Sequence, residues 1–132
     1  MKISVNATCP CHSGTKYKKC CLPYHNGANP PNALLLMRSR YSAYALKNAK
    51  YIISTTHPNN PDFTDNTKQW MEDILEFCNN TVFIGLSIME FCDGENEAFV
   101  IFKASLGDTQ FVEKSRFLNE NGKWLYESGK FE

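Results

Sequence analysis

Residues 81–128, "TVFIGLSIMEFCDGENEAFVIFKASLGDTQFVEKSRFLNENGKWLYES", decide the fold class of this 132-residue chain. Four parts of this stretch are rich in β-branched and aromatic residues, which favour β-strands. They are residues 81–91, 97–104, 110–118 and 123–128. Turn-forming pairs stand between them, namely Asp93-Gly94, Gly107-Asp108 and Asn121-Gly122. The stretch therefore predicts a four-stranded antiparallel meander.

Two-residue turns would assign every side chain of these strands to one face of the sheet. One face would then hold aromatic and small residues and the carboxylate Glu113, so we expect it to meet the helices. It comprises Phe83, Gly85, Ser87, Met89, Ala98, Val100, Phe102, Phe111, Glu113, Ser115, Phe117, Trp124, Tyr126 and Ser128. The other, more charged face comprises Ile84, Leu86, Ile88, Phe99, Ile101, Lys103, Lys114, Arg116, Leu125 and Glu127. A single bulge would invert part of this assignment.

Helical patterns precede the strands. "ALLLMRSRYSAYALKNAKYIIST" (33–55) predicts helices near 33–47 and 48–55, with Asn32 as the N-cap. Apolar side chains at 34, 37, 41, 44 and 45 follow one helical stripe, which leaves out Arg40. "TKQWMEDILEFCNN" (67–80) predicts a third helix, capped by Asp65 or Asn66. Helices followed by strands indicate an α+β fold in which helices pack on one sheet face.

A cysteine cluster, "CPCHSGTKYKKCC" (9–21), lies ahead of the helices. The start of the chain shows no apolar signal-peptide region, so we expect a cytoplasmic protein with reduced thiols. Disulfides therefore fit poorly, and the C-x-x-C pattern of a redox pair is absent. Zinc fits well because it binds about four soft ligands. We expect Cys9, Cys11, Cys20 and Cys21 to bind Zn²⁺ in a structural site. His25 or His12 remains an alternative to one cysteine.

The charges of the chain are divided unevenly along it. Residues 1–32 carry four lysines and no acidic residue, whereas residues 33–132 carry ten basic and fourteen acidic side chains. Lys16, Lys18 and Lys19 lie within the cysteine cluster, where they can offset thiolate charge or contact a partner. Four lysines are few for a nucleic-acid site, and they also suit an ordinary solvated surface.

Two family resemblances rest on these stretches. Cys9, Cys11, Ser13, Gly14, Tyr17, Cys20 and Cys21 match the pattern of the SEC-C motif, the zinc-binding segment of the translocase ATPase SecA. "LMRSRYSAYALKNAKYIISTTHP" (36–58), with the ending "SRF…GKWLYESG", is similar to the YchJ family of small bacterial proteins. This resemblance implies a SEC-C segment at 1–24 and an NTF2-like domain at 33–132. Residues 25–32 between them are rich in Pro, Gly and Asn, which predicts a linker. The resemblance also implies helices on the concave side of a curved sheet, and it implies no particular reaction.

Two functional hypotheses follow. In the first, the protein is a zinc-stabilised binding module whose basic segment docks on a protein or ribosomal surface, as the resemblance to SecA implies. In the second, the NTF2-like body binds or converts a small molecule in a pocket lined by Arg38, Tyr41, His57 and Glu113. A buried Glu113 needs a partner, and Arg38 and Arg40 are the candidates. An open pocket of roughly 300 Å³ or more would favour the second hypothesis.

Two further expectations concern the environment of the protein. No apolar run approaches the ~18 residues that a membrane span requires. An aliphatic patch around Ile84, Leu86, Phe99 and Ile101 predicts a surface that could pair two copies of the chain.

Overall fold

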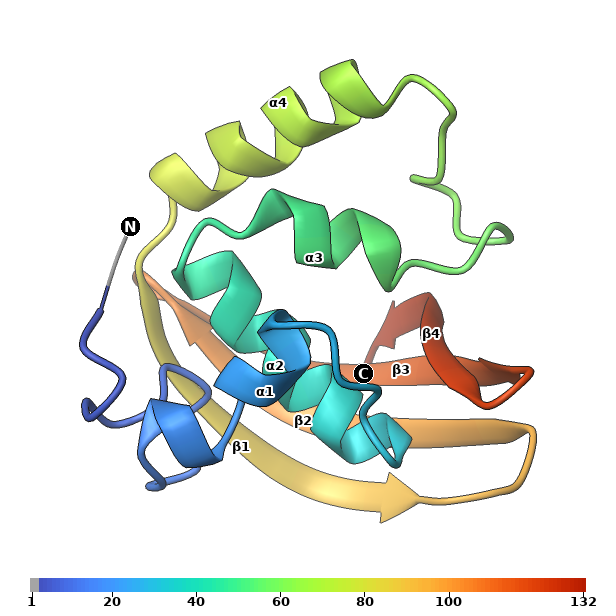
Figure 1. The fold of residues 1–132 in the computed structure, drawn as a ribbon, viewed down its shortest axis with the longest axis horizontal. Helices are drawn as coiled ribbons and strands as arrows, with labels where there is room; N and C mark the ends of the chain where they lie inside the picture. The colour runs from blue at the N-terminus through green and yellow to red at the C-terminus, as the bar shows by residue number, and fades with distance from the viewer. Residues whose placement is uncertain (1–2) are drawn as a thin grey trace.

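The computed structural model describes residues 3–132, which form one four-stranded antiparallel sheet covered on one face by helices (Figure 1). The strand order is β1-β2-β3-β4, which confirms the predicted meander and the α+β class. The elements are η1 (Tyr17–Lys19), α1 (Leu22–His25), α2 (Ala33–Ala45), α3 (Ala49–Ser54), α4 (Thr67–Asn79), β1 (Phe83–Cys92), β2 (Glu97–Leu106), β3 (Thr109–Glu120) and β4 (Lys123–Phe131).

Asparagine side chains begin the three longer helices. The Oδ1 atoms of Asn32, Asn48 and Asn66 each accept a hydrogen bond from the backbone N–H three residues on, at 2.9, 3.1 and 3.2 Å. Each bond satisfies one of the N–H groups that a helix leaves free at its start. Helix α2 ends at Ala45 and not near residue 47 as expected. The reason is that Lys47 adopts a φ of 60°, which a right-handed helix does not allow.

Helix α2 lies in the hollow of the curved sheet, with α3 and α4 stacked outside it (Figure 1). It contacts β2 and β4 on the sheet and α1, α3 and α4 on its other sides. Ser39, Arg40 and Ser42 are therefore buried together with Leu36 and Met37. The expectation that Arg40 lies off the buried face is wrong, because neighbouring elements cover α2 nearly all round.

The register of β1 differs from the expected one. The turn between β1 and β2 has four residues, 93–96, and β1 carries two irregularities, near Gly85 and near Glu90. Leu86 and Ile88 consequently face the helices, while Met89 is exposed. The expected assignment was wrong for these positions because each irregularity moves the following side chains to the opposite face.

The pairing of β2 with β3 follows the prediction, with Phe102 opposite Glu113. In the pairing of β3 with β4, a bulge next to Arg116 places Ser128 opposite Arg116, on the outer face. Ser128 was expected on the inner face. Arg116 and Glu127, both predicted for the charged sheet face, form an ion pair, with Nη1 and Oε2 3.1 Å apart.

The chain after α3 runs beside the outer strand β4. The backbone N–H of His57 donates to the carbonyl of Tyr126 at 2.8 Å, and the N–H of Tyr126 donates to the carbonyl of Thr55 at 2.8 Å. These bonds form a short parallel bridge between Thr56 and Tyr126. The bridge fixes the end of α3 against the sheet and closes one side of the hollow.

The outer sheet face keeps part of the expected apolar patch. Ile84 is exposed, and Phe99 and Ile101 are partly exposed, but Leu86 faces the helices. Pairing of two chains through this face stays a prediction. Among residues 3–132, none of the helices has the length and the apolar character that crossing a membrane requires.

Candidate metal centre and cavity

The four cysteines of the cluster converge. The Sγ atoms of Cys9, Cys11, Cys20 and Cys21 all lie within 4.8 Å of one another. The Cys11–Cys20 separation is 3.5 Å and the Cys20–Cys21 separation is 3.9 Å. Around a tetrahedral ion with metal–sulfur bonds of about 2.3 Å, sulfur atoms lie about 3.8 Å apart. A disulfide would need about 2.05 Å. The four side chains could therefore hold one metal ion.

A short hairpin positions Cys9 and Cys11, the first two residues of the cysteine cluster. The N–H of Cys9 donates to the carbonyl of Thr15 at 2.8 Å, and the N–H of His12 donates to the carbonyl of Cys9 at 3.1 Å. Gly14 has a φ of 86°, which glycine adopts without strain, and His12 has a φ of 63°. The His12 ring is exposed and packs edge-on against Tyr41, with ring centroids 5.7 Å apart. His12 therefore does not join the cysteine cluster.

The thiols interact strongly with one another. Hydrogen bonds from Cys21 and Cys9 hold the pKa of the Cys11 thiol well below its usual range. The hydrogen bond to Cys11 raises the pKa of Cys9 to about 12, with burial adding to the effect. One thiolate thus forms easily, and further thiolates need a compensating cation. Arg38 supplies positive charge from α2, since its Nη1 donates to the Cys11 carbonyl at 3.1 Å.

His25 fastens the cysteine segment to the body. Its Nε2 donates to the carbonyl of Ser39 at 2.8 Å, because a carbonyl can only accept, so Nδ1 accepts from the Tyr17 hydroxyl at 2.6 Å. The ring also packs edge-on against Tyr51. Burial lowers the pKa of His25, which favours this neutral tautomer. Both ring nitrogens are engaged, so the alternative of His25 as a ligand is not supported by its position.

The segment is therefore packed on the body and does not stand apart from it. Helix α1 (Leu22–His25) crosses the predicted border between the zinc-binding segment 1–24 and the linker 25–32, and its last residue contacts α2. The borders 1–24, 25–32 and 33–132 stay predictions. The composition of the linker gave no sign of this contact, because Pro, Gly and Asn report only on backbone preference.

The lysines of the segment face solvent. Lys16, Lys18 and Lys19 are exposed around η1, and none of the three forms an ion pair with the described residues 3–132. The opposite side of the segment contacts α2 through Arg38 and His25. The three ammonium groups therefore lie at the surface, on the side of the segment that faces away from α2.

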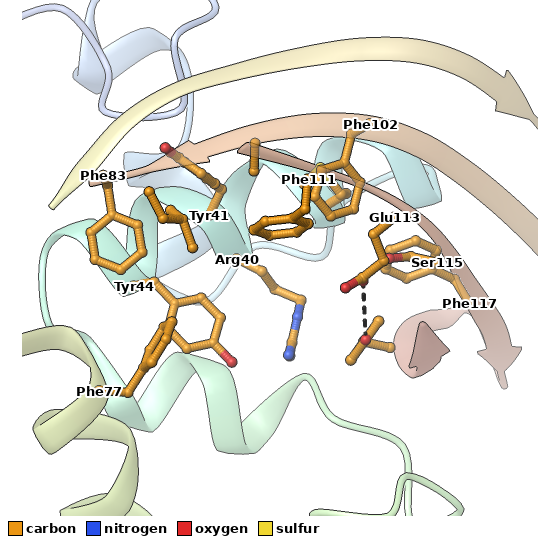
Figure 2. Close-up of a pocket in the computed structure, with 14 residues that line it drawn as sticks. Arg40, Tyr41, Tyr44, Phe77, Phe83, Phe102, Phe111, Glu113, Ser115 and Phe117 are labelled. Carbon is orange, nitrogen blue, oxygen red and sulfur yellow. Dashed lines mark hydrogen bonds between the residues drawn. The ribbon is translucent and has the colours of Figure 1, made fainter. Parts of the chain in front are cut away.

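A cavity of about 210 Å³ lies between α2 and the concave sheet face (Figure 2). Its walls are mainly aromatic, with one guanidinium, one carboxylate and several hydroxyls. It is lined by Met37, Arg40, Tyr41, Tyr44, Phe77, Phe83, Phe102, Ala104, Leu106, Phe111, Glu113, Ser115, Phe117 and Tyr126. The volume of the cavity is below the ~300 Å³ at which the range of common ligand pockets begins. It is larger than the voids that remain in a close-packed protein core.

Glu113 and Tyr126 form the polar end of this cavity. Oε2 of Glu113 accepts from the Ser115 hydroxyl at 2.7 Å and from the Tyr126 hydroxyl at 3.3 Å. Burial, followed by the charge of Glu113, raises the pKa of Tyr126, so this phenol stays a neutral donor. The guanidinium of Arg40 lies over the Tyr126 ring, 4.6 Å from its centroid. Arg40 is thus the arginine that shares the cavity with Glu113, although the two form no ion pair.

The four residues predicted for the pocket divide into two groups. Tyr41 and Glu113 line the cavity, whereas Arg38 and His57 lie outside it. Arg38 contacts the cysteine segment. His57 hydrogen-bonds Glu120 with its Nε2 at 2.8 Å and so anchors the loop after α3.

Arg40 is the cavity residue that sequence reasoning did not place there. The sequence indicates Arg40 only as a possible partner of Glu113, because Arg40 lies off the apolar stripe of the helix. The hydroxyls of Thr55 and Thr56 accept from Nη1 of Arg40 at 2.8 and 3.2 Å. Adjacent threonines at the end of a short helix are too common to indicate this contact without the structure.

Comparison with known proteins gives two family matches and several relatives. The model of the YchJ middle NTF2-like domain matches residues 32–129, and the SEC-C motif matches residues 6–23. A UPF0225 protein from Serratia proteamaculans (strain 568) is 39% identical over 130 residues, covering 92% of this chain and 81% of its own length.

Two solved structures have the same fold over most of the chain. The solution structure of a SEC-C motif containing protein from Rhodopseudomonas palustris has a TM-score of 0.79 at 29% identity and covers 94% of this chain and 98% of its own. A crystal structure of a SEC-C motif containing protein from Psychrobacter arcticus has a TM-score of 0.80 at 27% identity, covering 94% and 82%.

Proposed function

The chain belongs to the YchJ family, with a SEC-C motif ahead of an NTF2-like domain, and from this premise we propose that it is a zinc-stabilised binding module. In this proposal Cys9, Cys11, Cys20 and Cys21 hold one Zn²⁺, and the ion keeps the segment folded. The basic side of the segment docks on a negatively charged protein or ribosomal surface in the cytoplasm.

The chemistry of the donor set supports zinc. Four thiolates form a soft, closed ligand set, which is typical of structural zinc sites that lack an open position for catalysis. The segment has only a small apolar cluster, formed by the buried side chains of Cys9, Cys11, Tyr17 and Cys21. A metal is therefore expected to provide much of its folding free energy.

The observation that carries the docking proposal is the orientation of the segment. Arg38 and His25 fix its inner side to α2, while Lys16, Lys18 and Lys19 remain exposed and unpaired within the described chain. Three exposed ammonium groups on one segment steer an acidic partner by long-range attraction, which salt weakens. They are few for a nucleic-acid interface, so an acidic protein surface, whether of a free protein or of a ribosomal protein, is the better fit.

Charge reversal tests the docking proposal. The variant Lys16→Glu/Lys18→Glu/Lys19→Glu is compared with Lys47→Glu/Lys50→Glu/Lys103→Glu, which changes the same charge at exposed body positions. Native pull-downs from cell extract, with and without ribonuclease, should lose partners for the first variant only. Metal content and thermal unfolding of both variants are measured alongside. Equal capture by both variants would contradict the proposal. Capture that ribonuclease removes would indicate a ribosomal or RNA partner, and capture that resists ribonuclease would indicate a free protein.

A second candidate function is small-molecule binding in the cavity. The observation that favours it is the presence of Arg40 and Glu113, two ionisable groups of opposite sign, in one aromatic-walled space without an ion pair between them. In an ordinary hydrophobic core, two such groups would form an ion pair or would be replaced by apolar residues, because each buried charge needs compensation. No residue of the cavity is assigned a catalytic role.

A further inference from the structure

Arg40 is a buried cation without a counter-ion among residues 3–132. The residue is 7% exposed, and no carboxylate of the described chain lies within 4.0 Å of its nitrogen atoms. Burial of an uncompensated charge costs several kcal/mol. Such a group is retained more readily where it meets an anion that the protein does not itself supply.

One edge of the Arg40 guanidinium is occupied and the other is free. Nη1 donates to the carbonyl of Ile52 at 3.1 Å and to the hydroxyls of Thr55 and Thr56. Nε and Nη2 have no hydrogen-bond partner among the residues that the structure describes. Every fully enclosed side-chain nitrogen of these residues has a partner, so neither Nε nor Nη2 is fully enclosed. Nε and Nη2 therefore border accessible space. Together they form the planar fork that binds a carboxylate with two hydrogen bonds.

The position of this fork is fixed in advance. The bonds from Nη1 to the end of α3 hold the guanidinium on one side, and the Tyr126 ring lies 4.6 Å from Cζ on another. Figure 2 shows Arg40 reaching into the space between Tyr44 and Glu113. A fixed fork loses little conformational entropy when it binds, which raises affinity.

The rest of the cavity suits a small apolar body. Phe83, Phe102 and Phe111 contribute aromatic walls. A dry apolar cavity of about 150 Å³ is large enough to bind benzene. The volume of about 210 Å³ found here therefore admits one ring together with a small polar group.

We propose that the cavity binds a small monocarboxylic acid with a single ring or an apolar body of that size, its carboxylate paired with Nε and Nη2 of Arg40. This inference rests on the second candidate function, small-molecule binding in the cavity, and names the ligand class for it. Arg40 is the anchor for the anion, and the phenylalanines enclose the ring.

Glu113 limits which acids fit. Its Oε2 is engaged by Ser115 and Tyr126, while Oε1 has no partner among the described residues. Oε1 can accept a hydrogen bond from a hydroxyl or amine of the ligand. A second carboxylate at this end would meet the charge of Glu113 and be repelled. The cavity is therefore selective for a monoanion over a dianion.

Three probes of equal size test the ligand class. The protein is titrated with benzoate, benzamide and benzylamine, which are anionic, neutral and cationic, and binding is followed by heteronuclear NMR. Benzoate should bind about tenfold or more tightly than benzamide, because hydrogen bonds to a charged group are stronger. Shifts should concentrate at the Arg40 side chain and at cavity-lining residues. Phthalate, a dianion, should bind more weakly than benzoate.

Two variants separate an anchoring role for Arg40 from a purely structural one. Arg40→Met removes the charge and should abolish the preference for benzoate, while Arg40→Lys should retain part of it. Ala104→Leu narrows the cavity from strand β2 and leaves Arg40 in place, and it should abolish binding of every probe even if Arg40→Met fails to fold.

The outcomes distinguish this inference from the function on which it rests. Equal binding of benzoate and benzamide, or tighter binding of benzylamine, would overturn the carboxylate assignment while small-molecule binding stood. Binding of benzoate that Ala104→Leu leaves unchanged would place the site elsewhere and overturn the inference. No binding of any probe at millimolar concentration would overturn both.

Discussion

Arg38 on α2 contacts Cys11 in the cysteine segment: its Nη1 donates to the Cys11 carbonyl at 3.1 Å and lies 4.0 Å from the Cys11 sulfur. Arg40, two residues further along the helix, points to the cavity. Residues two apart are separated by about 200° around an α-helix. One turn of α2 therefore contacts the cysteine cluster on one side and the cavity on the other.

The first prediction concerns Arg38. The change Arg38→Ala removes a positive charge and a hydrogen bond next to a thiolate, so metal affinity should fall by about 10–100-fold, the usual effect of losing an outer partner of a metal ligand. Competition with a chromophoric chelator measures this affinity. In Arg38→Lys, which keeps the charge, metal affinity should fall less. Unchanged affinity in the alanine variant would show that the contact has no influence on the site.

The second prediction concerns removal of the metal. Chelation should abolish amide hydrogen-exchange protection at Cys9 and Tyr17, whose N–H groups form the hairpin of the segment, and leave the β2–β3 pairing protected. The reason is that the segment and the body have separate apolar clusters. Cys9→Ser should mimic chelation, whereas Cys92→Ser, an exposed cysteine outside the cluster, should not. Protection of the hairpin without metal would contradict the prediction.

The third prediction concerns His25. Replacing it with Gln breaks a buried network with Tyr17 and Ser39, which should lower the free energy of unfolding by about 1–3 kcal/mol. Denaturant unfolding measures this loss. Ser54→Ala, at an exposed position of α3, serves as the control.

His25 also predicts a pH dependence. Because burial lowers its pKa in the folded protein, the unfolded chain binds more protons below the ordinary value of 6.5. The stability that neutral His25 contributes is therefore complete above that value and is lost as the pH falls through and below it. Tyr17 and Tyr51, which pack against the ring, stay protonated throughout this range, because burial raises the pKa of each phenol to about 12. The wild type should lose more stability than His25→Gln between pH 7 and pH 5, and parallel curves would contradict this.

The fourth prediction concerns Gly129 on β4. A Cβ atom at this position would overlap the Glu113 carboxylate and the Tyr126 hydroxyl. Gly129→Ala should therefore displace Glu113 and lower the free energy of unfolding by about 1–3 kcal/mol. Gly85→Ala is the matched control, because its Cβ would meet only Ser105 at an ordinary 3.7 Å. Equal stability of the two variants in denaturant would contradict the prediction.

Sequence reasoning succeeded where the information is local. The cysteine pairs lie within thirteen residues, so their spacing alone predicts that they converge. Asn32 was recognised as a helix cap because capping depends on the next three residues. The turn at Gly107-Asp108 set the register of β2 with β3 for the same reason.

It failed where the information lies between distant elements. The faces of Leu86 and Met89 depend on irregularities in β1, which no local signal marked. The roles of Arg38 and Arg40 depend on what covers α2, namely a cysteine segment on one side and a cavity on the other. The sequence shows two arginines on one helix, and only the packing assigns each to its site.

The central claim, that four thiolates hold one zinc ion, is tested most directly by zinc-edge X-ray absorption on protein purified without chelator, together with its metal content. The account predicts one Zn²⁺ per chain surrounded by four sulfur atoms at about 2.3 Å. Absence of zinc with Cys9, Cys11, Cys20 and Cys21 present as disulfides, or a first shell that contains a nitrogen ligand from His25, would contradict it.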